Sequence, residues 1–262
     1  MDIKESRAKI KDAERSRIMG AEIPREKPII QIQKLRKEYI MGEERVVALR
    51  NINLSINRGE ICCIFGTSGS GKSTLLNQLA GLEKPTRGRV LIGGVPVSHL
   101  DENGLAAFRQ KHVGFVFQSY NLLPELTAVE NVAMPLMFRG VPKEIREREA
   151  KKMLCRVGLH NRMNHFPGQM SGGQQQRAGI ARAFITRPDI VFADEPTGNL
   201  DSKTTKEVME MIRKFARTFK QTIVLVSHDP EMTEYADRIV TLIDGEVVSD
   251  VKTENNTGKG EN

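Results

Sequence analysis

The sequence predicts an α/β fold in which a helical lobe is inserted into a domain built on a parallel sheet. Four short apolar runs rich in β-branched residues are typical of strands buried on both faces of such a sheet, namely residues 61–65, 190–194, 222–227 and 238–243. Helical stretches such as residues 203–220 separate the later runs, and this alternation favours parallel strands. Residues 29–35 and 48–56 alternate apolar and polar side chains, which predicts two half-buried strands. From about residue 127 to residue 166 the pattern is helical, which indicates the inserted lobe.

The chain divides into a core with two polar ends. Its 262 residues, 39% of them apolar, suit one large domain or one domain with an inserted lobe. Residues 1–27 alternate charges and predict a helix-prone or disordered extension. Residues 251–262 predict a polar, disordered tail. We therefore expect the domain to span residues 28–250, with the lobe at about residues 119–170.

The charge of the chain favours no particular polyanion. The net charge is +7, but the 40 cationic residues are interspersed with 33 acidic ones, as in residues 143–152. Such mixing is typical of solvated helix faces. The sequence contains no tryptophan, no zinc-finger spacing and no basic stripe rich in aromatic residues, so we expect no direct binding of nucleic acid.

The cysteines and the apolar runs indicate a soluble protein of a reducing compartment. Cys62 and Cys63 are adjacent in a predicted strand, where neighbouring side chains point to opposite faces, and Cys155 is alone. Neither a disulfide framework nor a cysteine metal site is expected, and a reducing cytosol fits best. No apolar run approaches the roughly 20 residues that span a bilayer, and no signal peptide is visible. If the protein works at a membrane, another chain must hold it there.

A first phosphate site follows the strand at residues 61–65. The segment GTSGSGKST matches G-x-x-x-x-G-K-[ST] between a predicted strand and a predicted helix, and its residues are Gly66, Thr67, Ser68, Gly69, Ser70, Gly71, Lys72, Ser73 and Thr74. The glycines let the backbone N–H groups point inward, and these groups and the helix N-terminus cradle phosphates. Lys72 can reach the β- and γ-phosphate oxygens, and the Ser73 hydroxyl can ligate Mg²⁺.

Acidic and polar side chains follow three other strands. Asp194 and Glu195 end the strand at residues 190–194, at the sheet edge where α/β folds bind ligands. Asp194 suits Mg²⁺, and Glu195 can polarise a water for in-line attack on a γ-phosphate. His228 lies at the same edge and can donate a hydrogen bond to that phosphate. Gln118 ends a strand-like segment where the helical lobe begins, so it can touch Mg²⁺ or the attacking water.

A second segment, SGGQQQR, is typical of a helix start that meets an anion. Ser171 is a favourable N-cap, and Gly172 and Gly173 permit close approach of the backbone to an oxyanion. The helix dipole adds to the attraction. Gly179 lies inside the helix that follows and costs roughly 1 kcal/mol relative to alanine.

In this order, GTSGSGKS, Gln118, SGGQQQR, IVFADEP, GNLDS and VSHD resemble the ABC-type ATPases over residues 28–250. The resemblance implies a P-loop NTPase core with a mixed sheet, an antiparallel β subdomain and an inserted α-helical lobe. It implies a homodimer that binds ATP and Mg²⁺ between subunits packed head to tail. The signature of one subunit, formed by Ser171, Gly172, Gly173 and Gln174, would then cover the γ-phosphate of the ATP held by the other.

The resemblance assigns roles to two further residues. Asp201 in GNLD corresponds to the loop that crosses the dimer interface, although a polar turn that caps the next helix fits the same residues. Tyr39, ahead of the P-loop, is the candidate aromatic that stacks on the nucleotide base, with a strand-edge tyrosine as the alternative.

The segment at residues 117–136, with DEPTGNLDS, is similar to the branch of lipoprotein-releasing, macrolide-export and antimicrobial-peptide-resistance transporters. This resemblance implies a separately encoded transmembrane permease and a cytoplasmic ATPase held on the inner face of the membrane. A groove near residues 120–124 and 132–138 would accept a helix of that permease. Two alternatives stay open: an ATPase of the division type that regulates cell-wall hydrolases, and a DNA-repair ATPase. A DNA-repair ATPase of this fold needs coiled-coil or zinc insertions. No heptads lie between the P-loop and the signature, which argues against this alternative.

Overall fold

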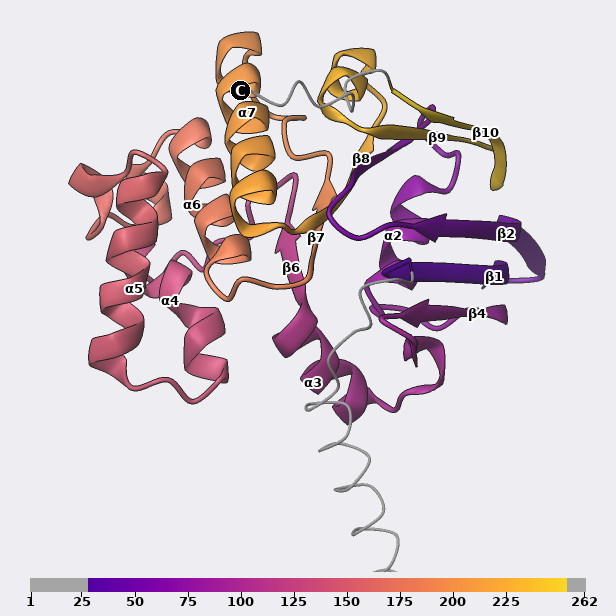
Figure 1. The fold of residues 1–262 in the computed structure, drawn as a ribbon, viewed down its shortest axis with the longest axis horizontal. Helices are drawn as coiled ribbons and strands as arrows, with labels where there is room; N and C mark the ends of the chain where they lie inside the picture. The colour runs from indigo at the N-terminus through magenta and orange to yellow at the C-terminus, as the bar shows by residue number, and fades with distance from the viewer. Residues whose placement is uncertain (1–27, 254–262) are drawn as a thin grey trace, which may run out of the picture.

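The computed structural model describes residues 28–253 (Figure 1). The predicted extension at residues 1–27 lies outside the described residues, as do residues 254–262 of the predicted tail. Within residues 28–253, no helix combines the length and the apolar character that are needed to cross a membrane.

The core of the molecule is a mixed sheet with the strand order β10-β9-β3-β8-β7-β6. The strands are β3 (Ile61–Phe65), β6 (Val113–Val116), β7 (Ile190–Asp194), β8 (Thr222–Ser227), β9 (Arg238–Ile243) and β10 (Glu246–Lys252). All neighbouring pairs are parallel except β9 and β10. Every residue of β8 is buried, as expected for a strand with both faces covered. The predicted mixed sheet is therefore confirmed.

The edge strand β10 extends to Lys252, two positions beyond the predicted end of the domain. Val251 and Lys252 pair with Ile239 and Arg238 of β9. The side chains of β10 are half-buried or exposed along its whole length, so the strand lacks the apolar run that marks the inner strands. Among the described strands, β9 alone provides its backbone partners. Because no apolar run marks the strand, sequence reasoning placed these two residues in the tail.

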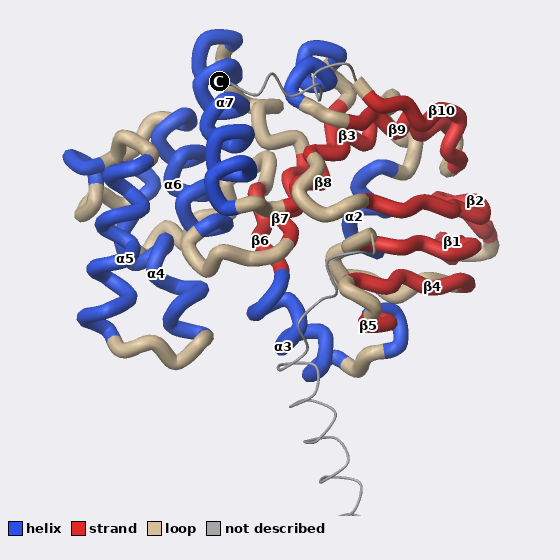
Figure 2. Tube along the Cα trace, in the orientation of Figure 1, coloured by secondary structure: helices blue, strands red, loops and turns tan. Residues whose placement is uncertain are grey.

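A second, antiparallel sheet has the order β2-β1-β4-β5. Its strands are β1 (Ile30–Met41), β2 (Glu44–Ile56), β4 (Arg87–Ile92) and β5 (Val95–Pro96). Strands β1 and β2 form one long hairpin, and both extend well beyond the predicted segments. The antiparallel subdomain that the resemblance implies is thus present, and it lies beside the core sheet in Figures 1 and 2.

Helices cover the core sheet and form the lobe. They are α2 (Lys72–Leu79), α3 (Glu102–His112), α4 (Ala128–Phe138), α5 (Lys143–Arg156), α6 (Gly172–Phe184) and α7 (Ser202–Phe219). Short 3₁₀ turns are η1 (Val97–His99), η2 (His160–Arg162), η3 (Pro167–Gln169) and η4 (Pro230–Tyr235). Figure 1 shows α4, α5 and α6 together on the side of the molecule opposite the antiparallel sheet. One apolar cluster joins the lobe and α7 to the core sheet, and a second joins α2 and the antiparallel sheet to it.

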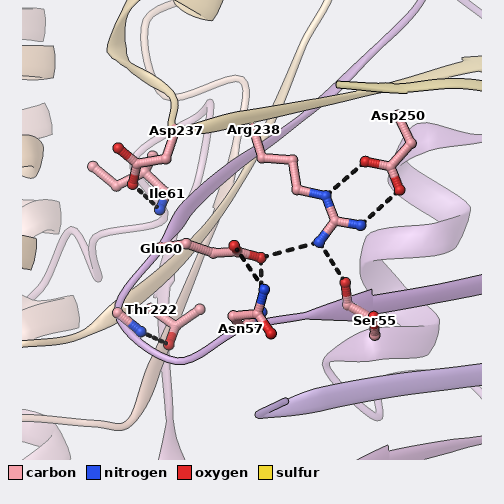
Figure 3. A network of polar contacts seen from close by, with 9 residues as sticks. Ser55, Asn57, Glu60, Ile61, Thr222, Asp237, Arg238 and Asp250 are labelled. Carbon is pink, nitrogen blue, oxygen red and sulfur yellow. Dashed lines mark hydrogen bonds and ion pairs between the residues drawn. The ribbon is translucent and has the colours of Figure 1, made fainter. Parts of the chain in front are cut away.

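A polar network centred on Arg238 joins the two sheets (Figure 3). Its guanidinium donates through Nε and Nη2 to the carboxylate of Asp250, at 2.6 Å each, and through Nη1 to the Ser55 carbonyl at 2.7 Å and to Glu60 at 3.3 Å. These bonds lower the pKa of the Asp250 carboxyl. Bidentate arginine–carboxylate pairs fix orientation as well as adding energy. The network therefore holds β2 of the antiparallel sheet against β9 and β10, beside the strand that leads into the P-loop.

Candidate functional site

The P-loop connects β3 to α2 and is shaped by close packing. A Cβ on Gly66 would lie 2.2 Å from the Leu242 carbonyl oxygen, and a Cβ on Gly71 would lie 2.5 Å from that of Ala48. Gly71 also has a φ of 98°, in the region that favours glycine. The glycine spacing thus serves the packing of the loop against β9 and β2 as well as the approach of a phosphate.

The N-terminus of α2 is prepared for an anion. No side chain caps it, and its first turn contains no acidic residue, so its N–H groups are free to bind phosphate oxygens. Lys72 is only 5% exposed, and its Nζ donates to the Thr67 carbonyl at 2.7 Å across the loop. The ammonium group is therefore held inside the cradle. A hollow of about 380 Å³ lies over the loop and is also lined by Val46, Glu195 and Asp244.

Two oxygen ligands suited to a divalent cation meet beside the P-loop. Ser73 Oγ donates to Asp194 Oδ1 at 3.4 Å. Burial, and secondarily the neighbouring Glu195 carboxylate, raises the pKa of Asp194. A half-buried carboxylate beside a second one is stabilised by a cation, and Mg²⁺ prefers such hard oxygen donors. Among the described residues, no three His, Cys, Asp or Glu side chains form a metal cluster, so a Mg²⁺ here would complete its coordination with phosphate, water or a neutral side chain.

Glu195 and His228 form a direct pair. His228 Nδ1 lies 2.8 Å from Glu195 Oε1. The pair forms because β7 and β8 are parallel neighbours and end at the same level. Glu195 has a φ of 42°, and its N–H donates to the Val226 carbonyl at 3.0 Å, so a left-handed turn directs the side chain out of the strand. Sequence reasoning placed both residues at one edge, and the structure shows that they touch.

Gln118 lies against the loop that follows Glu195. A Cβ on Gly198 would be 2.7 Å from the amide nitrogen of Gln118, and Asn199 Nδ2 donates to the Gln118 carbonyl at 3.1 Å. Among the hydrogen bonds of the described residues, the Gln118 side chain makes none to Ser73 or Asp194. Contact of Gln118 with Mg²⁺ therefore stays a prediction for the nucleotide-bound state.

The signature segment forms the predicted helix start. Ser171 is the N-cap of α6: its Oγ accepts from the Gln174 N–H at 3.4 Å, and Gln174 Oε1 accepts from the Ser171 N–H at 3.1 Å. This reciprocal pair is a capping box, which gives Gln174 a structural role. A Cβ on Gly172 would be 2.7 Å from the Tyr120 hydroxyl oxygen. The signature residues do not line the hollow over their own P-loop.

Asp201 caps α7. Its carboxylate accepts from the backbone N–H groups of Lys203 and Thr204 and from the Thr204 hydroxyl at 2.6 Å. These bonds lower the pKa of Asp201, the Thr204 hydroxyl first among them. The turn that caps the following helix is thus present, and a role at a dimer interface stays a prediction.

Tyr39 is half-buried on β1 and does not line the hollow over the P-loop. Its hydroxyl donates to Glu83 Oε2 at 2.7 Å, and Lys37 Nζ lies 4.9 Å from the ring centroid. Its cross-strand partner Val46 lines the hollow and is 43% exposed. Stacking of Tyr39 on a base therefore stays a prediction.

Sequence reasoning missed the connection between the loop after Gln118 and α6. Arg182 is 9% exposed, and its guanidinium donates to the carbonyls of Tyr120, at 2.8 Å, and Asn121. Both of these residues have left-handed backbones, with φ values of 61° and 49°. Burial lowers the pKa of Arg182. The signature helix is thereby fixed to the loop that joins the lobe to β6.

The packing around position 179 leaves room for a side chain and does not require glycine. A Cβ at this position would lie 3.5 Å from the Tyr120 carbonyl oxygen, which is an ordinary van der Waals distance.

We expect Gly179→Ala to raise the free energy of unfolding by about 1 kcal/mol, because alanine loses less backbone entropy in a helix. Denaturant unfolding of the two proteins measures this. As a matched control, Gly114→Ala should destabilise, since its Cβ would lie 2.4 Å from the Ala183 carbonyl oxygen.

The chain is similar to known proteins over most of its length. The family model described as "ABC transporter" matches residues 49–198. The chain is 46% identical to the lipoprotein-releasing system ATP-binding protein LolD of Geobacter metallireducens, over 85% of this chain and 99% of that protein. It is 44% identical to the macrolide export ATP-binding/permease protein MacB of Vibrio parahaemolyticus over 85% of this chain, but it spans only 34% of the length of MacB.

A solved structure is similar to this chain over the same share of its length. The dimeric ATP-binding cassette MJ0796, in a post-hydrolysis state bound to ADP and Pi, matches with a TM-score of 0.80 and 44% identity, over 85% of this chain and 98% of that one.

Proposed function

Because this chain belongs to the ABC transporter family and is an ABC-type ATPase, we propose that it is the motor subunit of a transporter whose permease is a separate chain. In this proposal two copies pack head to tail, and each MgATP lies between the P-loop of one copy and the signature of the other. The observation that best supports this arrangement is that the signature residues do not line the hollow over the P-loop of their own chain. The dimeric, ADP-bound form of MJ0796 supports the same arrangement.

The site residues suit in-line attack of water on a γ-phosphate. The N–H groups of the P-loop and Lys72 bind the phosphates, and the signature helix of the partner copy adds N–H groups and a dipole on the opposite side. Glu195 polarises the attacking water, and its contact with His228 orients the carboxylate. His228 would donate a hydrogen bond to the γ-phosphate. Mg²⁺, held by Ser73 and Asp194 and contacted by Gln118, would neutralise charge on the β- and γ-phosphates.

A groove of about 590 Å³ between α3, β6 and α4 offers a docking site for the permease. Met134, Pro135 and Phe138 of the predicted apolar segment line it, whereas Val132 and Ala133 are buried in the lobe. Residues 120–124 are not among its lining residues, so the groove lies on the α3 side of the predicted position. Phe138 is 63% exposed, which favours an apolar helix as the occupant.

We infer the location and the class of cargo by analogy with the relatives. The protein would lie on the cytoplasmic face of the membrane, held there by the permease. Similarity to LolD and MacB favours export or extraction of lipid-like, peptide or antibiotic cargo. Regulation of cell-wall hydrolases through a membrane partner remains the alternative, because it would use the same groove and the same ATPase site.

Replacing the exposed aromatic of the groove tests the coupling to a permease. We expect Phe138→Asp to retain basal ATP hydrolysis and to lose most of its binding to stripped membranes of the source cell, because a carboxylate opposes an apolar helix in the groove. Binding is measured by sedimentation with those membranes and with protein-free vesicles of their extracted lipid. The difference between the two is the binding that depends on membrane proteins.

The matched control is Val248→Asp. Val248 is 56% exposed and lies on β10, away from the groove. It should bind the membranes as the wild type does. Equal membrane binding by Phe138→Asp and the wild type would reject the groove as the permease site. A wild-type protein that does not hydrolyse ATP would reject the proposed motor function.

A further inference from the structure

We propose that a basic hollow on the antiparallel sheet binds the phosphate groups of acidic phospholipids in the leaflet that surrounds the permease. The hollow has a volume of about 900 Å³ and is lined by Lys34, Arg36, Arg87, Arg89 and His99. Among the described residues, no carboxylate lines it. The inference rests on the proposed function, because that function brings this face to a membrane.

Bulges in the strands form the hollow. The pairing of β1 with β2 shifts between Ile32 and Leu35, and the pairing of β1 with β4 shifts between Gln33 and Arg36. Lys34 lies within both shifts and has a left-handed backbone, with a φ of 49°. A β-bulge bends its strand and redirects side chains.

Neighbouring strands continue the same distortion. Asn51 on β2 and Gly88 on β4 also have positive φ values, of 52° and 84°. A Cβ on Gly88 would lie 2.3 Å from the Lys34 carbonyl oxygen, so only glycine lets β4 approach β1 this closely. The Lys34 N–H donates to the Asn53 side chain at 2.9 Å, which fixes the bulge. The cations are therefore gathered by a defined backbone feature.

Among residues 28–253, carboxylates do not balance the positive charges of the hollow. Arg36 and Arg87 are direct cross-strand partners, and like charges in this position destabilise a sheet. Glu38 lies at the margin and bonds to Arg36. Arg89 donates to the neutral amide of Gln33 at 2.6 Å. One carboxylate thus faces four cationic side chains, and an anion bound in the hollow would relieve their repulsion.

The hollow lies close along the chain to the groove that is proposed to hold the permease. His99 lines the hollow, and Asn103 lines the proposed permease groove only four residues later in the chain. Between them lies the start of α3, which Figure 2 shows at the same end of the molecule as β5. A permease helix seated in the groove would bring the hollow close to the lipid headgroups around it. Surface attraction of basic residues acts within about 10 Å at ordinary ionic strength.

The shape of the hollow favours an array of headgroups over a single small anion. Most of its lining residues are exposed, so no side chain encloses a ligand as the P-loop does. The cations come from two strands and a 3₁₀ turn and are spread over the face of the sheet. Membranes bind such basic clusters additively, with each Lys or Arg near the surface strengthening the attraction.

Flotation of the full-length protein with lipid vesicles tests this inference. The wild type should float with mixed phosphatidylglycerol/phosphatidylcholine vesicles at low salt, and less so with phosphatidylcholine alone. Lys34→Gln combined with Arg87→Gln should bind the mixed vesicles about 30-fold more weakly, since two cations near the surface are removed. Lys151→Gln combined with Lys206→Gln removes two exposed cations from α5 and α7 and should match the wild type.

The other outcomes would overturn the assignment. Equal vesicle binding by the two double variants would show a general charge effect without a site. A shift in melting temperature that inorganic phosphate alone gives to the wild type but not to the Lys34/Arg87 variant, and that is as large as the shift from vesicles, would indicate a small-anion site in the hollow. Binding of duplex DNA at moderate salt, lost in the Lys34/Arg87 variant, would indicate a nucleic-acid surface. ATP hydrolysis without vesicles, measured on the same preparations, tests the proposed function separately.

Discussion

Glu195→Gln should bind MgATP, fail to hydrolyse it and accumulate as a dimer in its presence. The substitution keeps the size and shape of the side chain but replaces the carboxylate that polarises the attacking water with a neutral amide. Glu195 lies between the hollow over the P-loop and a polar cavity of about 270 Å³ that also contains His228. Without hydrolysis, the contacts that ATP makes to both copies would persist, so the closed dimer would be the populated state.

The expected size of the effect follows from the role of a general base. Removal of such a group typically lowers turnover by about 10²–10⁴-fold. Phosphate release measures turnover, and size-exclusion chromatography with MgATP measures the dimer. Nucleotide affinity should be close to that of the wild type, because Glu195 makes no contact with the P-loop amides among the described hydrogen bonds.

Glu231→Gln is the matched control. Glu231 lines the same polar cavity and lies in η4, three residues after His228, but its carboxylate has no described bond to that histidine. It should turn over ATP like the wild type. A Glu195→Gln protein that stays monomeric with MgATP would contradict the composite site, and one that keeps full turnover would remove Glu195 from the mechanism.

Two inactive variants should restore activity to each other when they are mixed. Lys72→Ala removes the ammonium group held in the P-loop, and loss of a hydrogen bond to a charged group costs about 1.5–3 kcal/mol, roughly 10- to 150-fold in ATP affinity. Ser171→Arg places a large cation at the start of α6 and removes its N-cap, at a cost of about 1 kcal/mol in stability. The Lys72→Ala homodimer should therefore have little activity at ATP concentrations near the wild-type Kd, and the Ser171→Arg homodimer should have little activity because its arginine would fill the space for the partner's γ-phosphate.

The mixed dimer has one site that lacks both groups and one site that is complete. The complete site pairs the P-loop of the Ser171→Arg subunit with the signature of the Lys72→Ala subunit. If one complete site suffices for turnover, an equal mixture should recover about a quarter of the wild-type rate, because half of the randomly formed dimers are mixed. Phosphate release before and after mixing measures the recovery.

Mixing distinguishes the head-to-tail site from one built within a single chain. If the signature served its own P-loop, neither subunit would contain an intact pair and no activity would return. Lys72→Ala mixed with a second P-loop variant, Ser73→Ala, should also stay inactive, and it controls for simple stabilisation by mixing. Melting temperatures of the single variants show that both are folded.

Much of the fold was predictable because its signals are local. Strands buried on both faces need continuous apolar runs, and the runs at residues 61–65, 190–194, 222–227 and 238–243 match the strands β3, β7, β8 and β9 residue for residue. The expected burial on both faces is wrong for β9, in which only Val240 and Leu242 are buried. The edge strand β10 carries no such run, because one of its sides faces solvent and its partner lies in another segment. The lengths of β1 and β2 depend on bulges that only cross-strand packing determines.

The sequence by itself determined the chemistry of the phosphate site. The spacing of Gly66, Gly71, Lys72 and Ser73 between a strand and a helix is sufficient to predict a loop that cradles phosphate, because it depends on backbone conformation and on residues adjacent in the chain. Ser171 before two glycines predicts the N-cap of α6 for the same reason.

Only the tertiary structure decided which distant groups meet. The pairing of β7 with β8 brings His228 to Glu195, and the packing of the lobe brings Arg182 to the carbonyls after Gln118. The bulges of three strands gather the cations of the basic hollow, none of which forms a motif along the chain. The physical reason is that a motif records contacts within one turn or loop, whereas contacts between segments depend on strand order and packing, which many different sequences can satisfy.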